Sequence, residues 1–370
     1  MVRLLHTADI HLGAKFTTLG EKGREQREQV RATFKKLVSL ARDEKVDILL
    51  IAGDLFDSNL VAQKDIQLVK EQFDLLAKDN IHVCIIPGTH DCFDQDSIYR
   101  KVDFQSLCHN VIVFTGEGWL IKAFPRLNLT IHGRPNISNR SYESPLEGLH
   151  PLTSSRFHVA MAHGSLDIGS VDRDDHVFTI EQLRSSGMNY IALGHWHRAY
   201  PCLEKGVTAW YSGSPELISL DQKEPGQCLL VTILDSGDTT VERRQVGCRR
   251  YDEVTIDFSS INDLSELKSR ISRGADPNLV RRVTLKGARV EDIDREELTT
   301  ELQDLFFHLK IDDLSYPRLS EGQYEGRLII ANFVQLMKDY IEKCQDKLEK
   351  KNAEEALQLG LALLEGRKVL

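Results

Sequence analysis

Five short segments constrain the fold and function of this chain more than any other feature. Each places histidine or aspartate directly after an apolar stretch, and the five are Asp9-Ile10-His11, Gly53-Asp54-Leu55-Phe56-Asp57, Gly88-Thr89-His90-Asp91, His163-Gly164 and Gly194-His195-Trp196-His197. The apolar stretches, such as 46–52 and 81–86, have the composition of strands buried in a sheet. Ligands collect at the carboxyl ends of strands in open α/β sheets. The sequence therefore predicts that the five segments converge on one site.

The residue types in these segments favour a centre with two metal ions. Residues two apart on an extended segment point to the same side, so Asp9 with His11, and His195 with His197, can each present two ligands to one point. Imidazole and carboxylate together suit zinc, manganese or iron. About seven ligands suit two ions ~3.5–4 Å apart that share a carboxylate and hold a phosphoryl group. Each segment alone is explained by a turn or a hydrogen-bonded loop, and only their joint occurrence predicts the centre.

Composition narrows the class of protein. The 370 residues are 41% hydrophobic and 28% charged, as in an ordinary globular protein of two or three domains. Seven scattered cysteines without paired spacing fit reduced thiols in the cytoplasm. No apolar run reaches the ~18 residues of a membrane span, so no membrane contact is expected. The net charge of −9 argues against nucleic-acid binding through overall positive charge but leaves a local basic groove open.

The first ninety residues alternate strands and helices, which predicts parallel strands joined by right-handed crossovers. The predicted strands are 2–9, 46–52 and 81–86, and the predicted helices are 21–44 and 63–78. Beyond residue 110, closely spaced turn formers indicate short strands that we expect to form an antiparallel sheet: 111–114, 120–124 and 127–132. A polar surface loop is predicted at 134–155.

Three domains are predicted, comprising residues 1–246, 247–317 and 318–370. The middle domain has the pattern of a β-α-β unit followed by a further helix, with strands 251–258 and 280–285 and helices 263–273 and 296–309. The tail is expected to be helical, because apolar residues recur at helical spacing from Ile330 to Leu348. Asn352 is the predicted cap of a last helix.

Longer motifs resemble those of the calcineurin-like metallophosphoesterases, and within them the DNA-repair exonuclease branch of SbcD-like, YhaO-like and Mre-type nuclease subunits. The motifs are His6-Thr7-Ala8-Asp9-Ile10-His11-Leu12-Gly13, Gly53-Asp54-Leu55-Phe56-Asp57-Ser58, Pro87-Gly88-Thr89-His90-Asp91, Gly194-His195-Trp196-His197 and Tyr211-Ser212-Gly213-Ser214-Pro215-Glu216. The resemblance implies an α/β core of two packed mixed β-sheets flanked by helices. It also implies a small α+β (βαβ) DNA-capping domain and a C-terminal helical tail after that core.

The same resemblance implies the roles of the site residues. One ion is then held by Asp9, His11, Asp54 and His197, and the other by Asp54, Thr89, His163 and His195. The ions are expected to be Mn²⁺, with Fe²⁺, Zn²⁺ and Mg²⁺ as alternatives. Two such ions generate a bridging hydroxide that attacks phosphorus, and His90 assists at the phosphate or the leaving oxygen. Asp57 is a candidate to orient His90, with Asp91 as the alternative.

Position 89 departs from the family pattern, which has asparagine there. The threonine hydroxyl reaches less far and binds a hard cation more weakly than an amide carbonyl. Three arrangements stay open: Thr89 ligates through its hydroxyl, a water fills the gap, or the second ion binds loosely.

The predicted activity is that of a DNA exonuclease or endonuclease in DNA repair. The resemblance implies an SMC-like coiled-coil ATPase as a separate chain, because no P-loop motif occurs here, and a nucleoid-associated location. The tail stripe could dock that partner or pack on its own domain, and helix 63–78 is a candidate homodimer contact by position. Candidate DNA contacts are Arg243, Arg244, Arg249 and Arg250.

Two other functions stay open. One is a phosphodiesterase or phosphatase acting on small molecules, which would need neither the additional domain nor the tail. The other is a non-catalytic scaffold in which Thr89 marks a weakened second metal site. The remaining ligand types and His90 argue against the scaffold.

Overall fold

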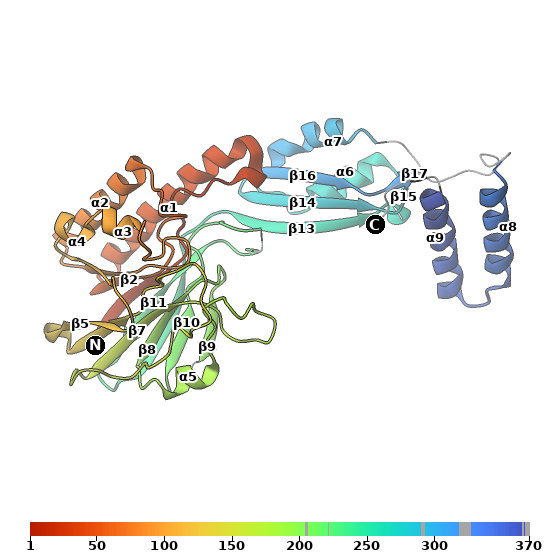
Figure 1. Ribbon diagram of the computed structural model, residues 1–370. Helices are drawn as coiled ribbons and strands as arrows, with labels where there is room; N and C mark the ends of the chain where they lie inside the picture. The colour runs from red at the N-terminus through yellow and green to blue at the C-terminus, as the bar shows by residue number, and fades with distance from the viewer. Residues whose placement is uncertain (204–205, 221, 290–292, 318–326, 365, 367–370) are drawn as a thin grey trace. The chain divides into compact units, whose positions relative to one another are not determined.

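The computed structural model describes residues 1–203, 206–220, 222–289, 293–317, 327–364 and 366 (Figure 1). The chain divides into two compact units, Met1–Arg250 and Tyr251–Leu370. The predicted boundary after residue 246 lies four residues before this division. The predicted boundary after residue 317 adjoins 318–326, which lie outside the described residues.

The first sheet contains six strands in the order β12-β11-β1-β2-β3-β4. Their bounds are β12 (Thr239–Gln245), β11 (Gln227–Ile233), β1 (Val2–Thr7), β2 (Ile48–Ala52), β3 (His82–Ile86) and β4 (Val111–Val113). Strands β1 to β4 are parallel, which confirms the predicted alternation, whereas β11 runs antiparallel to both β1 and β12. The long connections are α1 (Gly23–Asp43), preceded by η1 (Thr17–Lys22), and α2 (Gln63–Lys78).

The second sheet also contains six strands, in the order β5-β6-β7-β8-β10-β9. Their bounds are β5 (Leu120–Phe124), β6 (Leu129–Gly133), β7 (Phe157–His163), β8 (Tyr190–Gly194), β10 (Thr208–Tyr211) and β9 (Tyr200–Leu203). Strands β6, β7, β8 and β10 are parallel, and β5 and β9 add antiparallel edges. A turn, η2 (Pro125–Leu127), joins β5 to β6, and α5 (Ile180–Ser185) precedes β8.

The expected antiparallel sheet of residues 111–132 is wrong. Strand β4 pairs parallel with β3 in the first sheet, and only β5 and β6 form an antiparallel hairpin. The reason is the connection after β3, where two short helices, α3 (Ile98–Lys101) and α4 (Phe104–Leu107), return the chain to the amino end of the sheet. This crossover places β4 beside β3 rather than beside β5.

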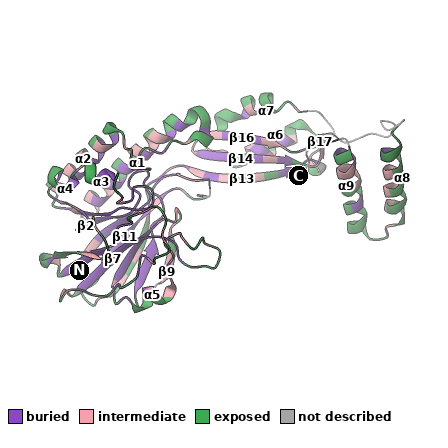
Figure 2. Cartoon of the chain, viewed as in Figure 1, coloured by how far each residue is buried: buried purple, intermediate pink, exposed green. Residues whose placement is uncertain are grey.

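Three apolar layers hold the first unit together, and Figure 2 shows its strands to be mainly buried. The middle layer joins the two sheets, with Leu4 and Leu50 from one and Ile131 and Val159 from the other. The two outer layers lie under α1 and α2 on the first sheet and around α5 on the second. Sheets covered on both faces explain the nearly continuous apolar strands and confirm the predicted core of two packed mixed sheets.

The second unit contains a three-stranded sheet in the order β13-β14-β16 and a short parallel pair, β15 with β17. The strands are β13 (Arg250–Asp257), β14 (Leu279–Lys286), β15 (Ala288–Arg289), β16 (His308–Asp313) and β17 (Tyr316–Pro317). The helical elements are η3 (Phe258–Ser260), α6 (Leu264–Ser272), α7 (Arg295–Leu302) and η4 (Gln303–Leu305). The predicted helix 296–309 is too long, because α7 ends at Leu302 and β16 begins at His308. Leu309 and Ile311 alternate as buried residues of β16, which pairs parallel with β14.

The tail forms two helices, α8 (Leu328–Lys343) and α9 (Lys347–Leu364). The predicted apolar stripe from Ile330 to Leu348 is therefore interrupted, because its last residue already belongs to α9. The predicted cap is wrong, because Asn352 lies inside α9. The carboxylate of Asp346 caps that helix instead, accepting the backbone N–H groups of Leu348 and Glu349 at 2.9 Å each. Within the described part of the chain, none of the helices is both long enough and apolar enough to cross a membrane.

Candidate metal centre

The five histidine and aspartate segments come together at one end of the two sheets. Asp9 and His11 follow β1, Asp54 and Asp57 follow β2, and Thr89, His90 and Asp91 follow β3. His163 is the last residue of β7, and His195 and His197 follow β8. The carboxyl ends of parallel strands from both sheets thus supply the candidate ligands, as expected for an α/β site.

Four of the candidate ligands have a left-handed backbone. The angle φ is 53° at Asp9, 51° at both His11 and Asp54, and 106° at His195. Aspartate and histidine tolerate this region better than most residues, but positive φ still costs free energy. Backbone hydrogen bonds hold two of these turns together, because Ile10 and His11 both donate to the carbonyl of Asp54, at 2.9 and 3.0 Å.

Asp54 is the residue that the other segments surround. Its side chain is buried, and its Oδ1 accepts the backbone N–H of His90 at 2.8 Å. Its Oδ2 lies 3.3 Å from the hydroxyl of Thr89, 3.3 Å from Nε2 of His163 and 3.7 Å from Nε2 of His11. One carboxylate therefore faces side chains from three other segments, which is the position required of a ligand shared by two ions.

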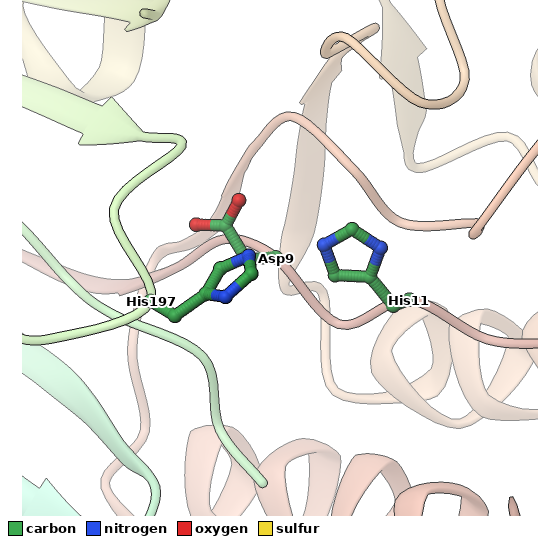
Figure 3. A group of neighbouring side chains, drawn as sticks. All are labelled: Asp9, His11 and His197. Carbon is green, nitrogen blue, oxygen red and sulfur yellow. The ribbon is translucent and has the colours of Figure 1, made fainter. Parts of the chain in front are cut away.

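A second carboxylate, Asp9, faces the other histidines. Asp9, His11 and His197 offer ligand atoms that all lie within 4.8 Å of one another, and Figure 3 shows these three side chains gathered together. Asp9, Asp54 and His163 form another such group. Each oxygen of Asp9 also lies 3.1 Å from the backbone nitrogen of His195, which fixes the start of the Gly-His-Trp-His segment.

The charges in the centre are strongly coupled. Burial lowers the pKa of His163, but the neighbouring carboxylate of Asp54 outweighs it and raises that pKa to about 9. Burial likewise opposes the charged form of His11, yet the carboxylates of Asp57, Asp54 and Asp9 raise its pKa. Burial also disfavours ionised Asp54, but His163 and His11 hold its pKa well below the ordinary value. The carboxylates and the imidazoles thus favour one another's charged forms, and a divalent cation would compete with protons for the same ring nitrogens.

Two glycines allow the segments to approach one another. A Cβ atom added to Gly88 would lie 2.2 Å from Oδ1 of Asp54, and one added to Gly53 would lie 2.1 Å from Nδ1 of His163. Gly53 also has a φ of 93°, which L side chains rarely adopt. The glycines of the two motifs therefore have a steric function: they keep the ligands within reach of a common point.

His90 is exposed and lies at the edge of the buried cluster. Its ring centroid is 4.6 Å from that of His11, and its Nδ1 lies 3.1 Å from the backbone carbonyl oxygen of Asp57. Because a carbonyl can only accept, Nδ1 is the donor and Nε2 is left for another partner. The carboxylate of Asp57 turns instead to His11, with Oδ1 3.3 Å from Nδ1. Asp57 therefore contacts His90 through its main chain and His11 through its side chain.

Asp91 has a different environment from that of His90. Its carboxylate is fully buried and accepts the backbone N–H groups of Gly88 and Phe56, at 2.8 and 3.2 Å, and the hydroxyl of Tyr99 at 2.6 Å. Burial and the nearby Asp54 raise the pKa of Asp91 to about 6, against the effect of these hydrogen bonds. These contacts hold the Pro87–Asp91 turn against the loop after β2, and they occupy both carboxylate oxygens with partners other than the His90 ring.

Several contacts that orient the ligands were not predicted from the sequence. Asp175 accepts a hydrogen bond from Nε2 of His195 at 3.0 Å and from the hydroxyl of Ser165 at 2.5 Å. Nδ1 of His163 lies 2.8 Å from the carbonyl of Ala52, and Nδ1 of His197 lies 2.9 Å from the hydroxyl of Ser219. Asp175 and Ser219 belong to loops without a recurring pattern, so only their place in space identifies them.

The four candidate DNA-contacting arginines have different surroundings. Arg249 is 5% exposed and donates to Gln26 and Glu25 of α1, at 2.5 and 3.0 Å. Arg244 pairs with Glu242 at 2.9 Å and with Glu44 at 3.4 Å, and the guanidinium of Arg243 lies 5.3 Å from the ring centroid of Trp210. Arg250 is the first residue of β13. Arg249 thus fastens the end of the first unit to α1.

The residues of the centre fit divalent cations. Both ring nitrogens of His11 are buried and make no hydrogen bond that is seen among the described residues; carboxylate oxygens of Asp57 and Asp54 lie 3.3 Å from Nδ1 and 3.7 Å from Nε2. A buried polar atom without a partner is costly, and a metal ion would satisfy it. Carboxylate oxygens and imidazole nitrogens are also a suitable donor set for Mn²⁺, Fe²⁺ or Zn²⁺.

Three known proteins are similar to this chain in sequence. A metallophosphoesterase named YhaO from Bacillus subtilis is 26% identical over 271 residues, which cover 71% of this chain and 65% of YhaO, just under two thirds of its length. The DNA double-strand break repair protein Mre11 of Methanopyrus kandleri is 25% identical over 317 residues, covering 80% of this chain and 67% of that protein. The SbcD component of the nuclease SbcCD from Bacillus subtilis is 25% identical over 313 residues, covering 75% of this chain and 77% of SbcD.

The family match covers most of the first unit. Residues 2–199 match the calcineurin-like phosphoesterase family, and this range includes all of the candidate ligands from Asp9 to His197. It also includes every parallel strand that carries them. The chain therefore belongs to the calcineurin-like phosphoesterase family.

Proposed function

We propose that this protein is a metal-dependent phosphodiesterase that cleaves DNA, most simply as an exonuclease or endonuclease in DNA repair. Members of its family bind divalent metals and hydrolyse phosphoester bonds. The observation that carries the proposal is the exposed His90 at the edge of a buried cluster of aspartates and histidines. With divalent ions bound, such a cluster would hold a phosphate, and the exposed imidazole would lie beside it as a proton donor.

The proposed ligand sets share Asp54. Asp9, His11, Asp54 and His197 would hold one ion, and Asp54, Thr89, His163 and His195 the other. Bound divalent ions would supply Lewis acidity for the phosphodiester and a nucleophilic water at neutral pH. Mn²⁺ is the first candidate, with Fe²⁺, Zn²⁺ and Mg²⁺ as alternatives.

In this mechanism His90 serves the leaving group. Its Nδ1–H is engaged by the carbonyl of Asp57 at 3.1 Å, which fixes the ring and leaves Nε2 pointing to a different partner. When Nε2 is protonated, it can donate to the oxygen on which negative charge develops as the P–O bond breaks. The backbone N–H of His90 binds Asp54 at 2.8 Å, so the donor is tied to the metal-binding carboxylate.

Thr89 is proposed to ligate the second ion, either directly or through a water. Its hydroxyl lies 3.3 Å from Oδ2 of Asp54 and 3.5 Å from Nε2 of His163, so it faces the same point as the other ligands. Exchange for asparagine would place a carbonyl oxygen, a better ligand for a hard cation, one bond farther from the backbone. We expect Thr89→Asn to lower the Mn²⁺ concentration for half-maximal cleavage by about tenfold. An unchanged metal requirement would show that Thr89 does not limit binding of the second ion.

Asp175 is proposed to position His195 for that ion. Its hydrogen bond to Nε2 leaves Nδ1 of His195 as the nitrogen available for a metal. We expect Asp175→Asn to weaken binding of the second Mn²⁺ by about 10–100-fold while the fold persists, measured by calorimetric titration of the metal-free protein. The matched control is Asp174→Asn, because the neighbouring Asp174 pairs with Arg140 at 3.0 Å instead. Equal metal affinity in both variants would contradict the positioning role.

DNA as the substrate rests on the relatives. Mre11 of Methanopyrus kandleri is a DNA double-strand break repair protein, and SbcD of Bacillus subtilis is a nuclease subunit. Both alignments extend over at least 75% of this chain, beyond the 198 residues of the family match, which supports a related role for the second unit. A small phosphoester would need no such additional unit.

A partner is also proposed, namely an SMC-like coiled-coil ATPase as a separate chain. Apolar side chains on α8 are exposed and could contact it: Leu328, Ile329, Leu336 and Tyr340 are 80%, 75%, 69% and 50% exposed. A homodimer through α2 and a nucleoid-associated location in the cytoplasm remain further proposals.

One assay tests the proposed activity. End-labelled single-stranded and double-stranded DNA are incubated with the protein and Mn²⁺, beside a chromogenic phosphodiester. Metal-dependent shortening or internal cleavage of DNA is expected. Turnover of the small ester without cleavage of DNA would favour the small-molecule alternative, and absence of both activities would favour the scaffold.

A further inference from the structure

A cleft lies in the first unit, at the end of the sheets opposite the metal centre. Its volume is about 1250 Å³, and it is lined by the residues that precede β2, β3 and β4 and by the β5–β6 hairpin. The metal ligands follow the carboxyl ends of these same strands, whereas the cleft is at their amino ends. The two sites are therefore separated by the length of the strands.

Two basic residues occupy positions in the cleft where the strand pattern predicts apolar ones. His82 opens β3 and shares its face with Cys84 and Ile86, which belong to the apolar layer between the sheets. Lys122 on β5 lies between Leu120 and Phe124, both of which pack against that layer. The ring of His82 is in contact with that of Phe124, at 5.0 Å between centroids.

Two other basic residues, Lys122 and His109, act on the ring of His82. Burial is the main cause that lowers the pKa of His82; a hydrogen bond with the backbone of Asn110 opposes it, and Lys122 and His109 lower it further. Its Nδ1 is buried and lacks a hydrogen-bond partner among the described residues. Neighbouring basic groups disfavour one another's charged forms, and an anion bound among them would relieve this repulsion.

The acids elsewhere in the cleft are mostly engaged. Asp47 accepts the backbone N–H of Arg3 at 2.8 Å, and Asp79 binds Arg42 at 2.5 Å. Asp43 is exposed at the end of α1. By contrast, Lys45, Lys122 and Arg126 make no side-chain hydrogen bond or ion pair that is seen within the described ranges of the chain. The cleft thus contains basic side chains that are available to bind an anion.

We propose that this cleft binds a small phosphorylated molecule of the nucleotide class. The phosphate would lie among His82, His109 and Lys122, and an aromatic or apolar group would lie against Phe124 and Leu127. The concave shape and size suit a small ligand, which is usually enclosed by apolar side chains with a few well-placed polar groups. Lysine and histidine provide the charge-assisted hydrogen bonds that a phosphate requires.

Calorimetric titration of the full chain tests this site. The probes are deoxyadenosine 5′-monophosphate, deoxyadenosine and inorganic phosphate, each added in the presence of EDTA so that the metal centre cannot bind them. We expect saturable binding of the monophosphate with one site per chain and at least tenfold weaker binding of the nucleoside and of phosphate alone. Lys122→Gln should weaken the monophosphate about tenfold without loss of stability, since Lys122 is exposed.

The control and the opposing results are equally defined. Lys64→Gln removes another exposed lysine, on α2 and outside the cleft, and should leave the affinity unchanged. The proposal is overturned if the monophosphate does not saturate, or if Lys122→Gln and Lys64→Gln behave alike. It is also overturned if an oligonucleotide binds more than tenfold tighter than the monophosphate with the same dependence on Lys122, because the occupant would then be a DNA strand.

Discussion

Replacing His90 with asparagine is expected to reduce the rate of DNA cleavage by about 10²–10⁴-fold while both metal ions still bind. The exposed ring of His90 lies at the edge of the cluster. The hydrogen bond from His90 to Asp54 is donated by the backbone N–H, which asparagine retains. What the substitution removes is a proton donor for the leaving oxygen. The loss should therefore appear in kcat rather than in the metal requirement.

The measurement is single-turnover cleavage of end-labelled DNA across a series of pH values, with Mn²⁺ binding followed in parallel. A matched control is His150→Asn, which removes another exposed histidine, one that lies outside the five ligand segments and contacts the carbonyl of Gly148 at 2.8 Å. If the His90 variant cleaved DNA as fast as the control at every pH, the assigned role of His90 would be refuted. A substrate with a better leaving group should recover part of the lost rate, because it needs less protonation.

Replacing Asp54 with asparagine is expected to have a larger effect, with cleavage below detection and no more than one tightly bound ion. Asp54 is the carboxylate that faces Thr89, His163 and His11 at 3.3, 3.3 and 3.7 Å, so both proposed ion sites depend on it. An amide offers one neutral oxygen in place of two charged ones and cannot bridge two cations as well. Ions that bind only the folded protein stabilise it, so the variant should also lose most of that stabilisation.

The thermal midpoint measured with and without Mn²⁺ reports this loss directly. Asp91→Asn is the instructive comparison, because Asp91 is as deeply buried but holds the Gly88 and Phe56 backbone and the Tyr99 hydroxyl. That variant should be less stable in EDTA yet still gain stability from Mn²⁺. An Asp54 variant that gained as much stability from Mn²⁺ as the unaltered chain would exclude Asp54 as the shared ligand.

Much of the fold follows from local sequence patterns. Apolar stretches such as 46–52 and 81–86 predicted the buried parallel strands, and helical spacing predicted α2 with its bounds at Gln63 and Lys78. The partner of a strand was harder to predict, because the pattern of β4 is the same whichever sheet it joins. The end of α7 was missed for a similar reason: Leu302, Leu305 and Leu309 recur at helical spacing, but Leu309 belongs to β16, which pairs with β14.

The candidate site divides in the same way. The segments that bear Asp9, Asp54, His90, His163 and His195 stand out because each follows a strand, and the structure brings all five together. Asp175 did not stand out, because it lies in a loop and reaches His195 from twenty residues away. Asp57 was assigned to His90 from its place in the motif, but the direction in which a carboxylate points depends on backbone turns that the motif does not describe.

The left-handed turns at Asp9, His11 and Asp54 have a consequence for how the protein selects its cofactor. These turns are held by backbone hydrogen bonds from one segment to the next, so the spacing of the ligands does not depend on an ion to create it. The metal site is then preformed, and binding of an ion requires little rearrangement of the backbone. Ions of similar radius should exchange readily in such a preformed site. The supply of each metal in the cell would then determine which ion is bound as much as the protein does.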